Sequence, residues 1–262
     1  TPYEISTKAE LLSDADDGLK GLAAFMRKEM GDAHVFGMDE MLLATAETVA
    51  GNNLESIDRV TMSDAAANAT LSSRADIDMY TTIDRSAASW ADATVSHNSG
   101  SDRALTTAML DTIIEGAMTN GANYNDLIIL TGHDTYMNLQ QLLTKGGDGG
   151  AATILRYDAA QGGAASQNGV LGQAGLNYDS RVGSYNGIPI FVSQHVAKDT
   201  VSRIHLLDLP QLALRVAAPT TYVANDNLAV TQSLTKQFAL ISAMELITYK
   251  FNTSGSVRDL NA

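Results

Sequence analysis

The chain has 262 residues, 45% of them hydrophobic, which is enough to bury a sizeable core as one large or two modest domains. Cysteine is absent, so disulfides, thiolate metal sites and thiol redox chemistry are excluded. The formal net charge is −13, and the Lys and Arg residues are dispersed singly, whereas a nucleic-acid-binding surface needs clustered cations. Composition therefore favours a folded acidic protein and disfavours direct phosphate binding.

The sequence predicts neither a membrane span nor an export signal. No apolar run approaches the roughly 18 residues that a bilayer-spanning helix needs. Residues 1–8 lack both a basic start and an apolar stretch. The first residue, Thr1, is consistent with proteolytic maturation or with a trimmed terminus. Asp outnumbers Glu and Lys is scarce, which suits a high-salt environment as well as an ordinary acidic surface.

The first fifty residues favour helices. Thr7 and Glu10 have the spacing of a capping box, which predicts a helix over residues 8–26 with a break at the acidic residues 14–18. A second helix is expected over residues 39–49, where apolar side chains gather on one side.

Residues 52–100 show weak periodicity and are dominated by Ser, Thr, Asp and Ala. Short strands are expected around residues 57–62 and 77–83. A stretch of this length without firm elements is unusual inside a compact domain. It is therefore interpreted as an extended arm or hairpin that pairs with another chain, with a disordered loop as the alternative.

A compact core of helix, strand and helix is expected next. A helix capped by Ser101 or Asp102 and ending near Thr119 places apolar side chains along one stripe. A continuous apolar run at residues 127–130 predicts a buried strand, and a further helix capped by Asp134 follows it. These elements predict an α/β core.

The remaining chain is first glycine-rich and then β-rich. Residues 146–175 are rich in Gly, Ala and Ser and are interpreted as a mobile or partner-ordered surface loop. β-Branched and aromatic residues separated by turn signals then predict strands over residues 187–192, 203–208, 212–216 and 238–251. The last strand is long enough to span a sheet.

His133 and Asp134 are the candidate catalytic residues. They follow the buried strand and precede a helix, where α/β enzymes place catalytic groups, so His133 could act as a base oriented by an acid. The alternative is that Asp134 caps the helix and His133 lies in a loop. The other histidines show no metal-ligand spacing, and the sequence has no nucleophile elbow and no phosphate-binding glycine motif. We therefore expect no catalytic residue, no metal and no cofactor.

Two tripeptides match the glycosylation acceptor pattern, beginning at Asn68 and at Asn252. Such short patterns arise often by chance, and neither is expected to be used. A surface adhesion domain carrying glycans at these positions is a further alternative, although it requires an export signal.

Five short stretches and the order of the elements are similar to counterparts in one family. The stretches are residues 84–86, 185–190, 202–208, 214–216 with 219–222, and 255–260. The order is a helical arm, a polar hairpin region, one long amphipathic helix, a buried strand with a helix, a glycine-rich loop and a β-rich end. Both features resemble the Hong Kong 97-type major capsid proteins of tailed bacterial and archaeal viruses.

The resemblance implies an α+β subunit. It implies an N-terminal arm over residues 1–51, an extended loop over 52–100, a peripheral domain over 101–145 and 237–262 that holds the spine helix, and an axial domain over 146–236. Subunits of this type assemble with themselves into pentamers and hexamers of an icosahedral shell. The shell encloses double-stranded DNA without sequence-specific binding, and the subunit is not an enzyme.

The resemblance also implies further partners, namely scaffold, maturation protease, portal and minor capsid proteins. It implies assembly in the host cytoplasm and a final location in the virion. Encapsulins, which share the fold and enclose cargo enzymes, are the nearest alternative. An α/β hydrolase using His133 and Asp134 is a more distant one.

Overall fold

The structure is a computed structural model that describes residues 2–6, 22–46, 54–71, 83–144, 181–225 and 235–261. Contacts divide the chain into two compact units. Unit 1 comprises Thr1–Leu42 and Leu214–Ile247, and unit 2 comprises Leu43–Ala213 and Thr248–Ala262. The predicted capping box at Thr7 and Glu10 and the predicted glycine-rich loop lie outside the described residues.

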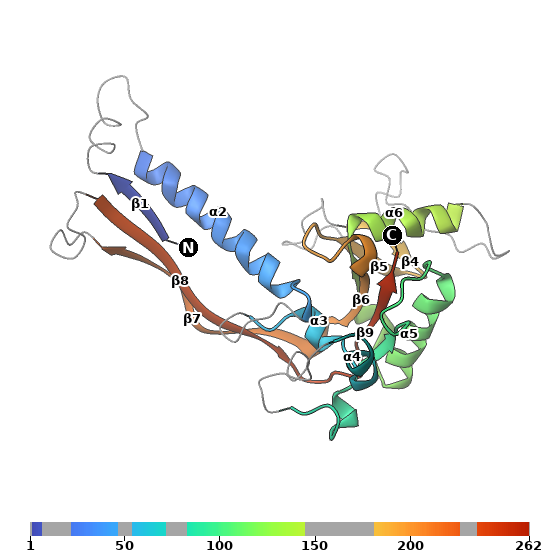
Figure 1. The fold of residues 1–262 in the computed structure, drawn as a ribbon. Coiled ribbons are helices and arrows are strands. Elements are labelled where there is room, and N and C mark those ends of the chain that lie inside the picture. Colours follow the sequence, from blue (N-terminus) through green and yellow to red (C-terminus); the bar gives the residue numbers. More distant parts are fainter. Residues whose placement is uncertain are drawn as a thin grey trace. The chain divides into compact units, whose positions relative to one another are not determined.

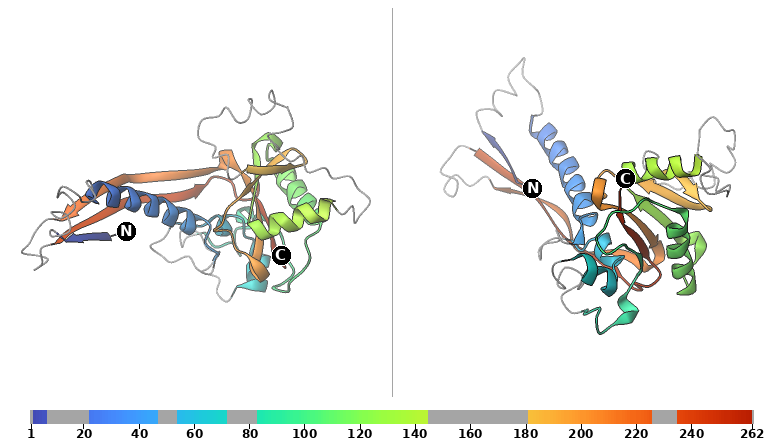
Figure 2. Two further views of the ribbon diagram at one scale, coloured as in Figure 1. Left: turned by 90° about the horizontal axis from the view of Figure 1, so that it is seen from above. Right: turned by 45° about the vertical axis from the view of Figure 1, so that its right-hand side comes forward.

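Unit 1 combines one long helix with a three-stranded sheet (Figure 1). Its helix is α2 (Leu22–Leu42), and its strands are β1 (Pro2–Ser6), β7 (Leu212–Asn225) and β8 (Thr235–Thr248). The sheet order is β1-β8-β7, with β1 antiparallel to β8 and Pro2 opposite Ala239. Figure 2 shows α2 lying along β7 and β8 within this unit.

The less exposed side of α2 is rich in methionine. Buried or half-buried side chains recur every three or four residues along it: Met26, Met30, His34, Met38 and Met41. The Nε2 atom of His34 lies 3.0 Å from the Oγ atom of Ser242 on β8. The Arg27 guanidinium lies 5.1 Å from the centre of the Tyr222 ring on β7. These two polar contacts connect α2 to both long strands.

The continuity of α2 corrects two predictions. The sequence predicted one helix ending near residue 26 and another beginning at Asp39, but α2 runs unbroken through both positions. Gly31 and Gly37 lie inside it, and a Cβ atom at either would meet nothing within 4 Å. Glycine there lowers helix propensity by about 1 kcal/mol per residue, and tertiary packing outweighs that cost.

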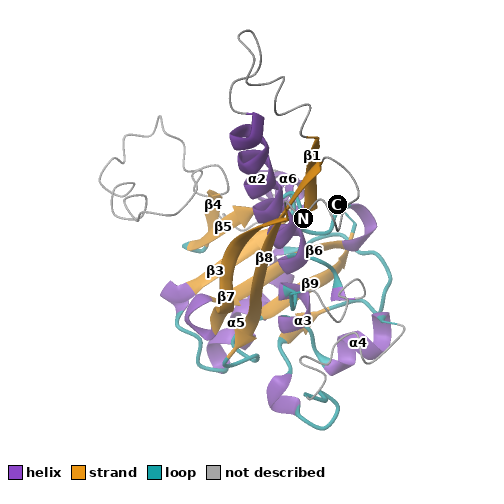
Figure 3. Ribbon diagram, turned by 90° about the vertical axis from the view of Figure 1, so that its left-hand side faces the viewer, coloured by secondary structure: helices purple, strands orange, loops and turns teal. Residues whose placement is uncertain are grey.

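Unit 2 is built on a six-stranded sheet in the order β2-β9-β6-β3-β5-β4 (Figure 3). Its strands are β2 (Thr94–Ser96), β3 (Leu127–Thr131), β4 (Arg181–Tyr185), β5 (Ile188–Val192), β6 (Ser202–Asp208) and β9 (Gly255–Leu260). Its helices are α3 (Ile57–Val60), α4 (Asp64–Thr70), α5 (Thr107–Thr119) and α6 (His133–Thr144). Short 3-10 turns are η3 (Ser89–Ala91), η4 (Tyr124–Asp126), η5 (Asp199–Val201) and η6 (Leu209–Gln211).

The central strand β6 separates two different environments. It runs antiparallel to both β3 and β9. Its Ile204 and Leu206 side chains belong to the apolar cluster that α5 and α6 also line. The alternate side chains, Arg203 and His205, make polar contacts with Asp58 and Thr61 on the other face. The period-two alternation of a strand therefore directs apolar groups to one layer and charged groups to the other.

Helix α5 approaches the sheet closely because one of its residues has no side chain. A Cβ atom added at Gly116 would lie 2.4 Å from the Oγ1 and Cγ2 atoms of Thr94 on β2. The helix ends at Thr119, and Gly121 follows with a φ of +86°, in the left-handed region that glycine adopts readily. The predicted end of this helix is therefore confirmed. Its start differs: the residue at the N-cap is Thr106, five residues after Ser101 and four after Asp102, and the helix begins at Thr107.

The prediction of a strand around residues 57–62 is wrong, because residues 57–60 form the helix α3. Ser56 caps α3 by accepting a hydrogen bond from the Arg59 amide at 3.3 Å, and Ser63 caps α4 in the same way through Ala66 at 3.3 Å. Two serine caps in eight residues thus outweigh a weak β pattern. The strand expected at residues 77–83 lies almost wholly outside the described residues.

Most of the later strand predictions are confirmed with altered ends. β3, β5 and β6 lie where the apolar runs predicted them. β7 is much longer than the expected 212–216, and β8 ends at Thr248 instead of reaching Phe251. β1, β2, β4 and β9 were not predicted as strands. The predicted arm, loop, peripheral and axial boundaries differ from the borders of the two units and stay a prediction.

Candidate functional site

Asp134, one of the two candidate catalytic residues, is fully engaged as a hydrogen-bond acceptor. It lies in the first turn of α6, where its Oδ1 atom accepts from the Thr135 amide at 2.7 Å. Its Oδ2 atom accepts from the Asp199 amide and from the Ser202 hydroxyl, each at 2.8 Å. Burial alone would raise the pKa of Asp134, but these donors lower it below its ordinary value. Asp134 therefore joins the start of α6 to the start of β6.

His133 has a different environment from its neighbour. Its side chain is exposed, and none of the three residues that donate to Asp134 is His133. The pair thus lacks the hydrogen bond by which an acid orients a histidine base. The two residues are neighbours in the chain, but their side chains do not form a pair. Asp134 lies inside the first turn of α6 and is not the cap that the sequence predicted. Among the described residues, no group of three or more His, Asp or Glu could hold a metal ion.

The two glycosylation patterns have unsuitable surroundings. Asn68 is exposed on α4, but its Nδ2 atom donates to Asp64 at 3.0 Å, and the Thr70 hydroxyl of the same tripeptide donates to the Ala66 carbonyl. The tripeptide at Asn252 ends in Ser254, which is completely buried. That neither position is used stays a prediction.

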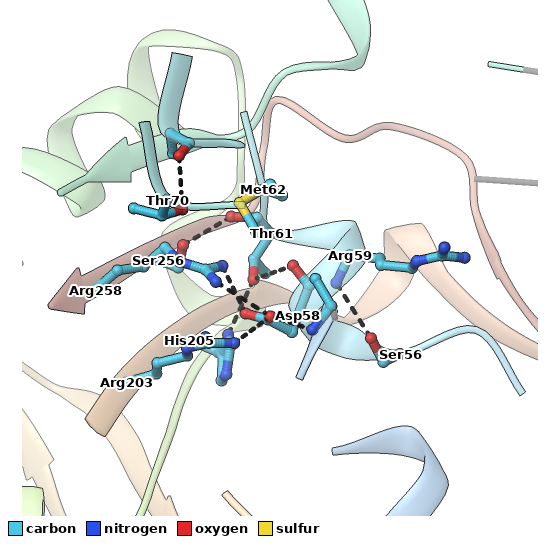
Figure 4. Close-up of polar contacts among 12 residues, drawn as sticks. Ser56, Asp58, Arg59, Thr61, Met62, Thr70, Arg203, His205, Ser256 and Arg258 are labelled. Atoms are coloured by element: carbon cyan, nitrogen blue, oxygen red, sulfur yellow. Dashed lines mark hydrogen bonds and ion pairs between the residues drawn. The ribbon is translucent and has the colours of Figure 1, made fainter. Parts of the chain in front are cut away.

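A buried charge network lies among the described residues of unit 2 (Figure 4). The Asp58 carboxylate receives two hydrogen bonds from Arg258, at 2.7 Å and 3.3 Å, and an ion pair from Arg203. The Ala46 amide donates to the same carboxylate at 2.8 Å. All three charged side chains are almost completely shielded from solvent. The site thus holds one anion between two cations, from α3, β6 and β9.

His205 completes this network on the same face of β6. Its Nδ1 atom lies 2.9 Å from the Thr61 hydroxyl, which itself donates to the Ile57 carbonyl at 3.1 Å. A neutral His205 with its proton on Nδ1 satisfies both contacts. The Ser256 hydroxyl on β9 donates to the Thr61 carbonyl at 2.7 Å. Thr61 therefore connects the end of α3 to two strands of the sheet.

The electrostatics of the network follow from burial and from the two arginines. Burial would raise the pKa of Asp58, but the guanidinium groups of Arg203 and Arg258 hold it well below its usual range. Burial, assisted by the two arginines and opposed by Asp58, lowers the pKa of His205 to about 4. At neutral pH, Asp58 is ionised and His205 is neutral. The network is therefore not poised for proton transfer near pH 7.

A second buried arginine site closes the end of α3. Arg85 is 1% exposed, and its guanidinium donates to the Met62 carbonyl and, at 2.6 Å, to the Arg59 carbonyl. The same group lies 5.2 Å from the centre of the Phe251 ring, against which the exposed Trp90 ring also packs. Arg85 thus supplies a donor to the Arg59 carbonyl in the last turn of α3 and shares the Met62 carbonyl with the Ala93 amide.

The sequence contained part of the signal for these sites. Arg85, Arg203, His205 and Arg258 all lie in stretches singled out for their family resemblance, and charged residues inside apolar strands call for a buried counter-charge. Asp58 was missed because its segment was interpreted as an arm that leaves the subunit. No helix in the described part of the chain is long and apolar enough to span a membrane.

Comparisons with known proteins give the fold. No family model matches the sequence, and no curated protein matches it. Among solved structures, the capsid asymmetric unit of cyanophage A-1(L) matches with a TM-score of 0.63 and 16% identity, over 100% of this chain and 77% of that one. The capsid of the native GTA particle matches with a TM-score of 0.59 and 9% identity, over 100% of this chain and 71% of that one.

An encapsulin has a similar structure. The SrpI encapsulin of Synechococcus elongatus PCC 7942 matches with a TM-score of 0.55 and 12% identity, over 100% of this chain and 72% of that one. The three structures share one architecture, so the chain has the mixed α+β, Hong Kong 97-type capsid fold that the resemblance predicted. At these identities the likeness defines the fold, and the function follows as a proposal.

Proposed function

We propose that the chain is the major capsid protein of a tailed virus, whose copies assemble into an icosahedral shell. The observation that carries this proposal is the match of the whole chain to two capsid subunits. A shell protein needs rigid subunits and large contacts between copies. The buried network around Asp58 supports the first requirement, because it fixes α3 to two strands of the sheet.

The shell would consist of pentamers and hexamers around double-stranded DNA, and its location would be the virion after assembly in the host cytoplasm. The net charge of −13 supports a container better than a DNA-binding protein, because an acidic inner wall does not adhere to packaged DNA. Scaffold, maturation protease, portal and minor capsid proteins would be its further partners.

The spine helix of the subunit has two candidates. The resemblance assigns it to the helix ending at Thr119, which is α5 with 13 residues. α2 has 21 residues and lies in the same unit as the two longest strands, so it fits an elongated supporting element better. Both assignments remain proposals.

Particle size tests the proposed function most directly. The purified chain would be studied by negative-stain microscopy and light scattering in low and in high salt, since screening reduces repulsion between acidic subunits. Shells, or free pentamers and hexamers, would support a capsid-type protein. A monodisperse monomer in both salts would contradict the proposal.

An encapsulin-like compartment is the second candidate, because the SrpI encapsulin matches over the whole chain. The contents of particles from the native source distinguish the two. Nuclease-protected double-stranded DNA would support the viral capsid, whereas a protein cargo without DNA would support the compartment.

A further inference from the structure

Strand β7 presents an unusual surface. Each residue from 214 to 223 is exposed, and no other run in the described residues is as long. Four of these side chains are large and apolar: Leu214, Val216, Tyr222 and Val223. β7 is also the last strand in the order β1-β8-β7, so among the described strands it has a neighbour on one side only. Exposed apolar strands at a sheet edge are sites of association.

Unit 1 as a whole buries little of its apolar surface. Among its described residues, the buried hydrophobic side chains are Met30 and Leu246. The exposed large hydrophobic ones are Phe25, Val35, Phe36, Leu214, Val216, Tyr222, Val223 and Ile241. In unit 1, exposed large hydrophobic side chains therefore outnumber buried ones. In unit 2 the buried ones predominate, because its strands and helices share a continuous core. A protein surface of this kind is normally covered by a partner.

The charge pattern indicates which partner. Residues 209–225 contain Arg215 and no Asp or Glu, in a chain with 30 acidic residues and a net charge of −13. Identical acidic subunits repel each other over most of their surface, and repulsion is smallest where acidic groups are missing. An acidic nucleic acid or an acidic peptide would instead require a cluster of cations, whereas β7 carries a single cation, Arg215.

We propose that residues 214–223 of β7 form a contact with a second copy of this chain. The inference rests on the proposed function and names the surface through which copies associate. Pro219 has no amide hydrogen, so it interrupts any continuous strand-to-strand hydrogen bonding along the free edge. The contact is therefore made chiefly by apolar side chains. Val216 and Val223 lie seven residues apart in β7, on opposite faces of the strand, so they probe its two faces separately.

Two matched variants test this contact. Val216→Asp and Val223→Asp each place a buried charge in the proposed contact, whereas Met137→Asp places one on α6, where Met137 is 54% exposed. The assembled fraction would be measured by analytical ultracentrifugation in high salt, with circular dichroism melting as the check on folding. We expect at least a tenfold loss of assembled material for the valine variant on the face that the second copy covers, and none for Met137→Asp.

The outcomes separate this inference from the proposed function. If the wild type assembles and both valine variants assemble equally well, the β7 contact is refuted while the shell function stands. If the wild type stays monomeric in all salts, the proposed function and the copy-to-copy contact both fail. Amide hydrogen exchange of the wild type gives a readout without mutation, with protection of residues 212–225 in assembled material as the expected result. Equal exchange in assembled and free protein would overturn the contact.

Discussion

The carboxylate of Asp58 and the guanidinium of Arg258 meet at 2.7 Å inside unit 2, although 200 residues separate them in the chain. The pair joins α3 to the C-terminal strand β9, and Arg203 on β6 binds the same carboxylate. A buried ion pair adds little net stability over an apolar replacement, but removal of one partner leaves an uncompensated charge.

Asp58→Asn is therefore expected to destabilise the protein strongly, by about 3–5 kcal/mol. The substitution keeps the shape of the side chain but removes the negative charge that pairs with the Arg203 and Arg258 guanidiniums. Urea unfolding followed by circular dichroism measures the effect. Asp32→Asn on the exposed side of α2 is the matched control and is expected to be neutral. Equal unfolding midpoints for both variants would contradict the role of the network.

The buried His205 predicts a loss of stability in mild acid. Its pKa is about 4 in the folded protein and 6.5 in the unfolded chain, so the unfolded chain binds more protons between these values. The free energy of unfolding should then be highest above about pH 6.5 and fall, by a few kcal/mol, as the pH is lowered to about 4. Unfolding midpoints across this range test the slope. His205→Gln should flatten it, while His133→Gln, at an exposed position, should leave it unchanged.

Two glycine substitutions should have opposite effects. Gly116→Ala places a Cβ atom 2.4 Å from Thr94 and should cost about 1–3 kcal/mol, despite the better helix propensity of alanine. Gly31→Ala in α2 meets nothing within 4 Å and should be neutral or stabilising by up to about 1 kcal/mol. Thermal unfolding of both variants measures the difference. A stable Gly116→Ala protein would show that α5 does not pack closely on β2.

His133 and Asp134 should behave as unrelated residues. Asp134→Ala removes the acceptor for the Asp199 amide and the Ser202 hydroxyl, so it should destabilise unit 2 by about 1–3 kcal/mol. His133→Ala alters an exposed side chain and should change neither stability nor particle assembly. Thermal unfolding and light scattering provide the two measurements. Loss of a hydrolytic turnover in both variants, without loss of stability, would restore the catalytic interpretation.

Short-range patterns predicted the elements of unit 2 that depend on neighbouring residues. The apolar run 127–130 and the stripe leading to Thr119 gave β3 and α5. Strand pairing between distant segments could not be predicted from the sequence. β1 and β9 are strands because they pair with distant residues, Pro2 with Ala239 and Val257 with Ile204. The Asp58 network has the same origin, since its arginines lie 145 and 200 residues away.

The two faces of β6 also limit how the chain can change in length. An insertion of one residue before Arg203 would exchange the faces of the strand. Arg203 and His205 would then enter the apolar layer beside α5 and α6, and Ile204 and Leu206 would face Asp58. A one-residue insertion within β6 is thus expected to be disfavoured, because it would exchange a charged layer and an apolar layer along the whole strand.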